Sequence, residues 1–130
     1  MLTYLWIALG GALGSVARFS CNGLISAKLG GTFPWGTLLI NVTGSFAIGF
    51  FAALTGANGR WPVSDDVRKF FMVGICGGFT TFSAFSLQTL ELTQSGQSLR
   101  AGANIVGSVV LCILAVWLGH WPATALTAQK

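Results

Sequence analysis

Charged side chains are scarce in this 130-residue sequence. Asp, Glu, Lys and Arg together make up 8% of it, only three residues are acidic, and there is one histidine. Soluble domains carry about 25% charged residues, whereas 53% of this chain is hydrophobic. The scarcity of charge excludes an ordinary soluble globular domain.

Cysteines are also few. Cys21, Cys76 and Cys112 fall in separate apolar stretches and match neither a disulfide framework nor a metal-binding spacing, so we expect small buried hydrophobes. The N-terminal run "MLTYLWIALGGALGSVA" lacks the basic region that precedes the apolar part of a signal peptide. We therefore expect a retained membrane span at the N-terminus.

Four long stretches contain no charged residue, namely 1–17, 29–59, 70–90 and 101–129. About 20 apolar residues are enough to cross the hydrocarbon core of a bilayer. The sequence therefore predicts a single all-α membrane domain over residues 1–130. Its four transmembrane helices are expected near 1–27, 35–57, 67–93 and 100–120.

The orientation of these spans is only weakly marked. Four spans place both termini and the second connector on one side of the membrane. That side carries Arg60, Arg68, Lys69 and Lys130, and the other carries Lys28 and Arg100. Because basic residues near span ends set orientation, so small a difference leaves two interpretations open: one orientation, or insertion both ways up.

The third stretch contains "GICGGFTTFSAFS", residues 74–86, with glycines and hydroxyl side chains at mid-depth. Glycine weakens a helix by about 1 kcal/mol relative to alanine, so Gly77-Gly78 followed by Thr80-Thr81 favours a break there. The alternative is a continuous helix whose glycines allow close packing and whose hydroxyls bond back to their own helix.

A break would expose carbonyl oxygens, which are ligands for hard cations such as sodium. No Asp or Glu lies at this depth, so backbone dipoles alone would have to hold the cation. One break supplies too few oxygens, whereas a two-fold symmetric dimer would bring a second set against the first.

Phenylalanines and serines alternate after this position. Phe82 and Phe85 are three residues apart and share a helical face, and Ser83 and Ser86 form a parallel polar row. The positive edge of an aromatic ring can stabilise a desolvated anion. The alternative is that the two rings pack against neighbouring helices.

Asn41 and Asn104 open the similar strings "NVTGS" and "NIVGS", about 63 residues apart. Each amide needs hydrogen-bond partners in the bilayer, and Asn104, Ser108 and Cys112 form a polar stripe with a four-residue step. The stripe indicates either a water-accessible path between helices or helix–helix hydrogen bonds of roughly 0.6 kcal/mol each. A two-span repeat preserves direction, so an inverted arrangement would require a second chain inserted upside down.

Small residues four apart predict close helix packing. The pairs are Gly10 and Gly14, Ser45 and Gly49, and Ala103 and Gly107.

Charges near the spans have separate interpretations. Arg18 lies inside the first predicted span, so it is expected either to line a cavity or to reach the interface from a tilted helix. Asp65 and Asp66 precede the third span, where negative charge suits a helix N-terminus, so we expect them to cap it.

Three segments together resemble the Fluc (CrcB) fluoride channels: "GGALGSVAR" at 10–18, "PWGTLLINVTGSF" at 34–46 and "GGFTTFSAFS" at 77–86. The fourth span matches loosely through "NIVGS". The resemblance implies a non-enzymatic channel, a dual-topology homodimer of antiparallel four-span subunits. Its two pores would export fluoride passively across the bacterial inner membrane, with lipid and the second copy as partners and no nucleic acid.

The resemblance also implies roles for particular residues. A structural sodium ion would sit at the dimer centre on backbone carbonyls of Gly77 and Thr80. Ser83, from the polar row, is expected beside the other pore-lining residues, which are Asn41, Phe82, Phe85, Ser108 and Arg18. The sequence departs from the family pattern at Ala84 and Cys112, where hydroxyl residues are common, and at Gln88, where Glu is usual.

The main rival is a small proton-coupled exporter. That activity needs an ionisable carboxylate inside the membrane, and every acidic residue here is at or beyond a predicted span end. An accessory subunit of a larger complex is the second rival, and it predicts no ion flux from the protein alone.

Overall fold

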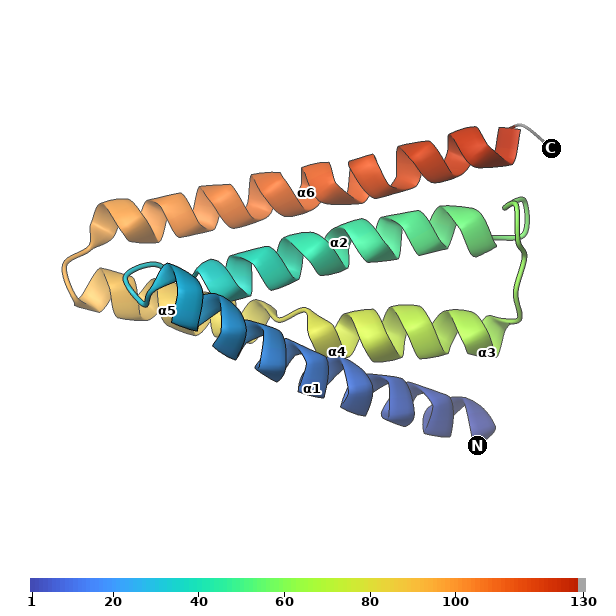
Figure 1. Cartoon of the computed structure of the whole chain (residues 1–130), viewed down its shortest axis with the longest axis horizontal. Helices are drawn as coiled ribbons and strands as arrows, with labels where there is room; N and C mark the ends of the chain where they lie inside the picture. Colours follow the sequence, from blue (N-terminus) through green and yellow to red (C-terminus); the bar gives the residue numbers. More distant parts are fainter. Residues whose placement is uncertain (129–130) are drawn as a thin grey trace.

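The computed structural model describes residues 1–128, and these form helices joined by short connectors (Figure 1). Helix α1 spans Leu2–Leu29, α2 Trp35–Thr55 and α6 Ser98–Ala128. The third apolar stretch consists of α3 (Asp65–Arg68), the π-helix η1 (Lys69–Cys76), α4 (Gly77–Phe79) and α5 (Phe82–Gln94). Lys130, which entered the charge comparison, lies outside the described residues.

The four predicted spans are confirmed as helices that are long and apolar enough to cross a membrane, with mean hydropathies from 1.3 to 2.2. The fourth helix continues past its expected end near residue 120, through Pro122 to Ala128. Proline lacks only one backbone donor, Ala123 beyond it is fully buried, and Arg60 donates to the Leu126 carbonyl at 2.8 Å. These contacts support the additional turns.

Both described ends of the chain and the 56–64 connector lie at one end of the bundle, as the four-span topology predicts (Figure 1). The 30–34 and 95–97 connectors lie at the other end. Helices α2 and α6 run in the same direction side by side, and α1 packs against the first half of the third span.

Glycines bring α1 and the third span into backbone contact. A Cβ added to Gly10 would lie 2.9 Å from the Gly74 Cα, and one added to Gly14 would lie 2.8 Å from the Phe79 nitrogen. Both distances are too short for a real side chain. The predicted packing role of Gly10 and Gly14 is confirmed.

A second glycine seam joins α2 and α6. A Cβ on Gly49 would lie 3.1 Å from the Val116 Cα, and one on Gly119 would lie 3.0 Å from the Phe50 nitrogen. Gly107, by contrast, would have nothing within 4 Å of its Cβ. The predicted contact through Ala103 and Gly107 is therefore wrong within the subunit, because α6 turns a different face toward α2.

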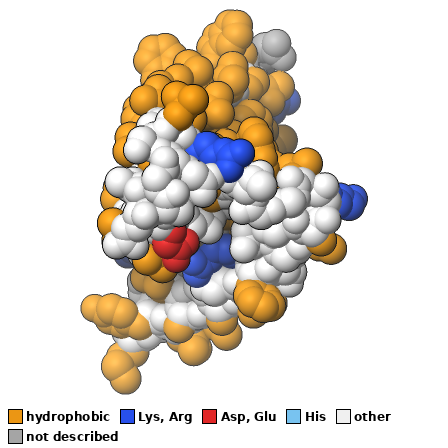
Figure 2. Space-filling view, turned by 90° about the vertical axis from the view of Figure 1, so that its left-hand side faces the viewer, with side chains coloured by type: hydrophobic (Ala, Val, Ile, Leu, Met, Phe, Trp, Pro, Cys, Tyr) orange, Lys and Arg blue, Asp and Glu red, His pale blue; other side chains and the backbone are white. Residues whose placement is uncertain are grey.

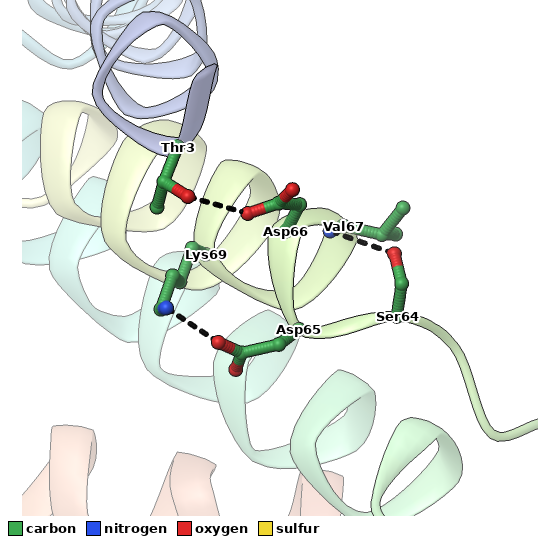
Figure 3. A network of polar contacts seen from close by, with 6 residues as sticks. All are labelled: Thr3, Ser64, Asp65, Asp66, Val67 and Lys69. Atoms are coloured by element: carbon green, nitrogen blue, oxygen red, sulfur yellow. Dashed lines mark hydrogen bonds and ion pairs between the residues drawn. The ribbon is translucent and has the colours of Figure 1, made fainter. Parts of the chain in front are cut away.

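The third span begins at a polar corner (Figure 3). Ser64 caps it, since its Oγ accepts a backbone N–H at 3.4 Å. Asp66 accepts a hydrogen bond from the Thr3 hydroxyl at 2.7 Å, and Asp65 pairs with Lys69. The expectation that the aspartates cap the helix is corrected: Ser64 provides the cap, Asp66 links the first turn to α1, and Asp65 pairs within the third span.

Candidate functional site at the broken third helix

The third span is interrupted at two residues. Helix α4 ends at Phe79 and α5 begins at Phe82, and between them Thr80 (φ −80°, ψ 158°) and Thr81 (φ −154°, ψ 117°) are extended. The Thr80 N–H and hydroxyl both donate to the Cys76 carbonyl, at 2.9 and 2.8 Å. This confirms the predicted break and excludes the continuous helix.

Asn41 holds the interrupted backbone from the neighbouring helix α2. The Thr81 N–H donates to Asn41 Oδ1 at 2.7 Å, and Asn41 Nδ2 donates to the Thr81 carbonyl at 3.0 Å. The carboxamide thus pairs with both backbone groups of one residue, as a neighbouring β-strand would. Because unpaired backbone groups cost several kcal/mol in hydrocarbon, this pairing stabilises an extended segment inside the membrane.

The break leaves carbonyl oxygens exposed. In a continuous helix the Thr81 N–H would donate to the Gly77 carbonyl, but here it donates to Asn41. Within residues 1–128 no backbone hydrogen bond reaches the carbonyls of Gly77 or Thr80 from across the break. Free carbonyl oxygens suit a hard cation such as sodium, and the same residues contain no cluster of His, Cys, Asp and Glu able to hold a metal ion.

A cavity of about 430 Å³ lies beside the break. Helix α2 forms one side of it, the third span another and α6 the third. It brings together six of the residues predicted from the sequence: Asn41, Gly77, Thr80, Phe82, Phe85 and Ser108.

The two phenylalanines are in contact but differ in exposure. Their ring centroids are 5.2 Å apart and the ring planes are inclined by 48°. Phe85 is 8% exposed and points into the subunit, whereas Phe82 is 77% exposed at the rim of the cavity. The three-residue spacing therefore places the rings side by side, with Phe82 turned away from the rest of its own subunit.

Ser83 does not line this cavity. It is exposed, and its Oγ lies 3.2 Å from the Thr81 Oγ. Ser86, the other member of the predicted polar row, donates back to the Phe82 carbonyl at 2.9 Å. Both hydroxyls therefore contact groups near the start of α5 and not the cavity.

Arg18 lies in a separate cavity of about 380 Å³. Thr81 lines both cavities, so the two lie on either side of the break. Arg18 is half-buried, and Gln88, which shares its cavity, has a buried Oε1 with no hydrogen-bond partner among the described residues. The structure therefore does not bring Arg18 together with the phenylalanines.

Gln88 also borders a third cavity, of about 490 Å³, at the end of the bundle that carries the 30–34 and 95–97 connectors. Glu91 and Arg100 line it as well. Figure 2 shows this end, where basic and acidic side chains stand amid polar surface with apolar side chains around them.

Asn104 and Ser108 have different surroundings. Asn104 is 2% exposed and donates to the Thr89 hydroxyl on α5 at 2.9 Å. Ser108 donates weakly to Asn104 Oδ1, at 3.4 Å, and lines the cavity beside the break together with Cys112. The predicted stripe thus joins two helices at its first residue and lines the cavity at the other two.

Sequence reasoning missed the position of two polar cavity residues, Ser45 and Thr81. Ser45 was assigned to packing alone, but it lies on the cavity wall one turn after Asn41. The four-residue spacing of Asn41 and Ser45, which places both side chains on one helical face, could have indicated this position. Thr81 was recognised as part of the break, but its position between the two cavities depends on the fold, and no local pattern indicates it.

Comparison with known proteins agrees with these features. Residues 5–120 match the family model described as "CrcB-like protein, Camphor Resistance (CrcB)". The chain is 59% identical to a protein of Methylocella silvestris over 99% of this chain and 98% of the relative. It is 60% identical to one of Opitutus terrae, over 100% and 98%, and 60% identical to one of Rhodospirillum rubrum, over 92% of each.

All three relatives carry the name "Fluoride-specific ion channel FluC". The family match covers most of the chain, and the relatives align along almost its whole length. With four membrane-spanning helices and a third helix interrupted at the expected motif, this chain belongs to the CrcB (FluC) family of membrane channels.

Proposed function

We propose that this protein is a fluoride-selective ion channel of the bacterial inner membrane. The observation that carries the proposal is the pairing of Asn41 with the extended backbone of Thr81, which maintains a break in the middle of a membrane helix beside a cavity with polar and aromatic lining. The name shared by relatives that are about 60% identical supports the choice of fluoride.

Fluoride is small and strongly hydrated, so a pathway must replace its water with hydrogen-bond donors. Asn41 Nδ2 uses one of its two N–H groups on Thr81, and the Ser45 hydroxyl makes no hydrogen bond within the described chain. Both residues line the cavity beside the ring pair Phe82 and Phe85. Amide, hydroxyl and positive ring edges together could solvate the ion.

A second copy inserted upside down would complete the pathway. The cavity opens on the subunit surface, and Phe82 at its rim is 77% exposed. Lipid offers no partners for the polar lining, whereas an antiparallel subunit would cover it and give two equivalent pores per dimer. The weak charge difference between the two ends favours insertion in both orientations.

The same dimer would hold a structural sodium ion. In the described part of the chain the carbonyls of Gly77 and Thr80 accept no backbone hydrogen bond from across the break, and Gly77 is exposed on the subunit surface. Two subunits would offer four such oxygens, which are the ligands that a hard cation prefers. The bound charge would give the pathway the positive potential that an anion needs.

Arg18 and Ser83 would act nearer the ends of the pathway. The Arg18 cavity meets the main cavity at Thr81, so a half-buried cation there would attract anions into a vestibule. Ser83 is exposed next to Phe82 and would contribute where the partner subunit covers α5.

Transport through this channel would be passive. A membrane potential of about 100 mV, negative inside, drives each outgoing anion with roughly 2.3 kcal/mol. A proton-coupled exporter is disfavoured because, among residues 1–128, no carboxylate lines the cavity beside the break.

Fluoride efflux from liposomes tests the proposal. Replacing Phe82 with isoleucine removes the ring edge, and a lost interaction of about 1.4 kcal/mol slows conduction about tenfold. We expect a severe loss of flux in Phe82→Ile. Phe46→Ile is the matched control, because Phe46 is 43% exposed on α2 and lies outside the cavity.

Near-normal flux in Phe82→Ile would refute the role of the ring. Wild-type protein that passes no fluoride but moves organic cations against a proton gradient would refute the channel itself.

A further inference from the structure

An asparagine of α1 lies directly over the first turn of α2. A Cβ added to Gly36 would overlap Asn22 Oδ1 and would lie 3.0 Å from Asn22 Cγ, so the carboxamide rests against the start of the helix. Asn22 is half-buried, and within residues 1–128 its side chain makes no hydrogen bond. Glycine at position 36 therefore leaves the space that this carboxamide occupies.

The start of α2 attracts the oxygen end of the amide. Pro34, the N-cap residue, provides no side-chain cap, and the N–H groups of Gly36 and Thr37 have no backbone acceptor in the described part of the chain. Free N–H groups and the helix macrodipole make this end positive. Because the oxygen and nitrogen of a carboxamide lie on opposite sides of its carbon, the Asn22 Nδ2 donor is turned away from α2.

Asn22 shares the Arg18 cavity of about 380 Å³ with Thr37. Arg18 and Asn22 lie four residues apart on α1, so they are neighbours on one helical face. Thr37 is 5% exposed, and its hydroxyl makes no hydrogen bond within residues 1–128. Buried polar groups in folded proteins are normally hydrogen-bonded. The partner of these groups is therefore expected among the contents of the cavity.

We propose that Asn22 is a further residue of the fluoride pathway, oriented by the start of α2 so that its Nδ2 donates to the anion in the Arg18 cavity. Gly36 is the positioning residue, because a side chain there would displace the carboxamide. The proposal rests on the proposed function. It adds a donor that replaces part of the hydration shell of the anion before the anion reaches Asn41, one turn after Thr37 on α2.

Gly36→Ala tests the positioning. The added methyl group meets the end of the Asn22 side chain first, and the nearest backbone atom is the Asn22 Cα at 3.5 Å. Alanine also favours a helix more than glycine does. We expect an unfolding midpoint equal to or above that of the wild type, whereas fluoride efflux from liposomes at low fluoride should fall about tenfold, because a hydrogen bond to a charged group is lost.

Gly23→Ala is the matched control. Gly23 follows Asn22 on α1, and a Cβ added to it would meet nothing within 4 Å. This change should leave efflux at the wild-type rate. A Gly36→Ala variant that conducts as well as Gly23→Ala would overturn the positioning role.

Asn22→Asp separates the donor from the packing. Aspartate has nearly the same shape and is attracted more strongly to the start of α2, but an ionised carboxylate has no N–H to donate. We expect a stable protein whose efflux at low fluoride falls at least tenfold, whereas a purely structural role would leave efflux unchanged. The loss should shrink at saturating fluoride, because the cavity is then filled by mass action. Wild-type efflux in Asn22→Asp would overturn the donor role.

A double-mutant cycle connects the two residues. Gly36→Ala should add nothing to Asn22→Ala, because the carboxamide that it displaces is already absent. Additive losses would mean that Gly36 acts without Asn22. Wild-type protein without fluoride efflux would refute the channel and, with it, this role of Asn22, whereas equal efflux in wild type and Asn22→Ala would refute the role of Asn22 alone.

Discussion

The strings "NVTGS" in α2 and "NIVGS" in α6 share three of their five residues, yet their asparagines make different contacts. Asn41 pairs with the backbone N–H and C=O of Thr81, whereas Asn104 binds the side chains of Thr89 and Ser108. The first amide replaces missing backbone hydrogen bonds. The second joins the side chains of two helices away from the break.

The glycines of the two strings differ in the same way. A Cβ on Gly44 would meet the Thr80 side chain and lie 3.3 Å from Phe79 Cδ1, whereas a Cβ on Gly107 would meet nothing within 4 Å. The first string thus lies against the broken segment, and the second lies on an open helix face. The role of each string therefore depends on the backbone that lies opposite it in the fold.

The largest expected effect comes from Asn41→Ala. This change leaves the Thr81 N–H and C=O without partners, at about 1–3 kcal/mol for each buried group. We expect stability to fall by roughly 2–6 kcal/mol and fluoride efflux to be lost, measured by denaturant unfolding in detergent and by liposome flux.

The control is Thr43→Val, because the exposed Thr43 only donates back to the Leu39 carbonyl of its own helix. A stable, conducting Asn41→Ala variant would show that the break maintains itself without the amide.

An intermediate effect is expected at the glycines. Gly44→Val should force Thr80 out of the position in which its hydroxyl binds the Cys76 carbonyl, and overpacking of this kind costs about 1–3 kcal/mol. Gly107→Ala is the matched change in the second string and should be neutral or stabilising by up to about 1 kcal/mol. Unfolding midpoints compare the two. A marked loss of stability in Gly107→Ala would mean that the second string also packs closely, and the contrast between the strings would fail.

The smallest effect is expected for Asn104→Ala. Side-chain hydrogen bonds between membrane helices are worth about 0.6 kcal/mol, so losing the contacts to Thr89 and Ser108 should cost about 1 kcal/mol. A double-mutant cycle with Thr89→Val should give a coupling energy of about 0.6 kcal/mol. A loss of stability equal to that of Asn41→Ala would show that pairing with the backbone and pairing with side chains contribute equally, and the contrast between the two asparagines would fail.

Local features of the sequence predicted much of this structure. The four spans follow from long charge-free stretches, which are local features of the chain. Gly77-Gly78 and Thr80-Thr81 favoured the break without excluding a continuous helix. The close packing of Gly10 and Gly14 was predictable from their local spacing. The C-terminal end of α6 was not, because burial of Ala123 and the Arg60 contact sustain the helix beyond Pro122.

The tertiary structure decided which of these residues meet. Composition alone determined that the chain crosses a membrane four times, because hydropathy is summed along the chain. The glycines and threonines of the third span favoured a break, which the pairing with Asn41 then maintains. Only the fold decided that Asn41 pairs with Thr81, that Ser45 joins the cavity, and that Arg18 and Ser83 lie outside it. These outcomes depend on how each helix is rotated against its neighbours, and small residues in the seams set that rotation through contacts distant in sequence.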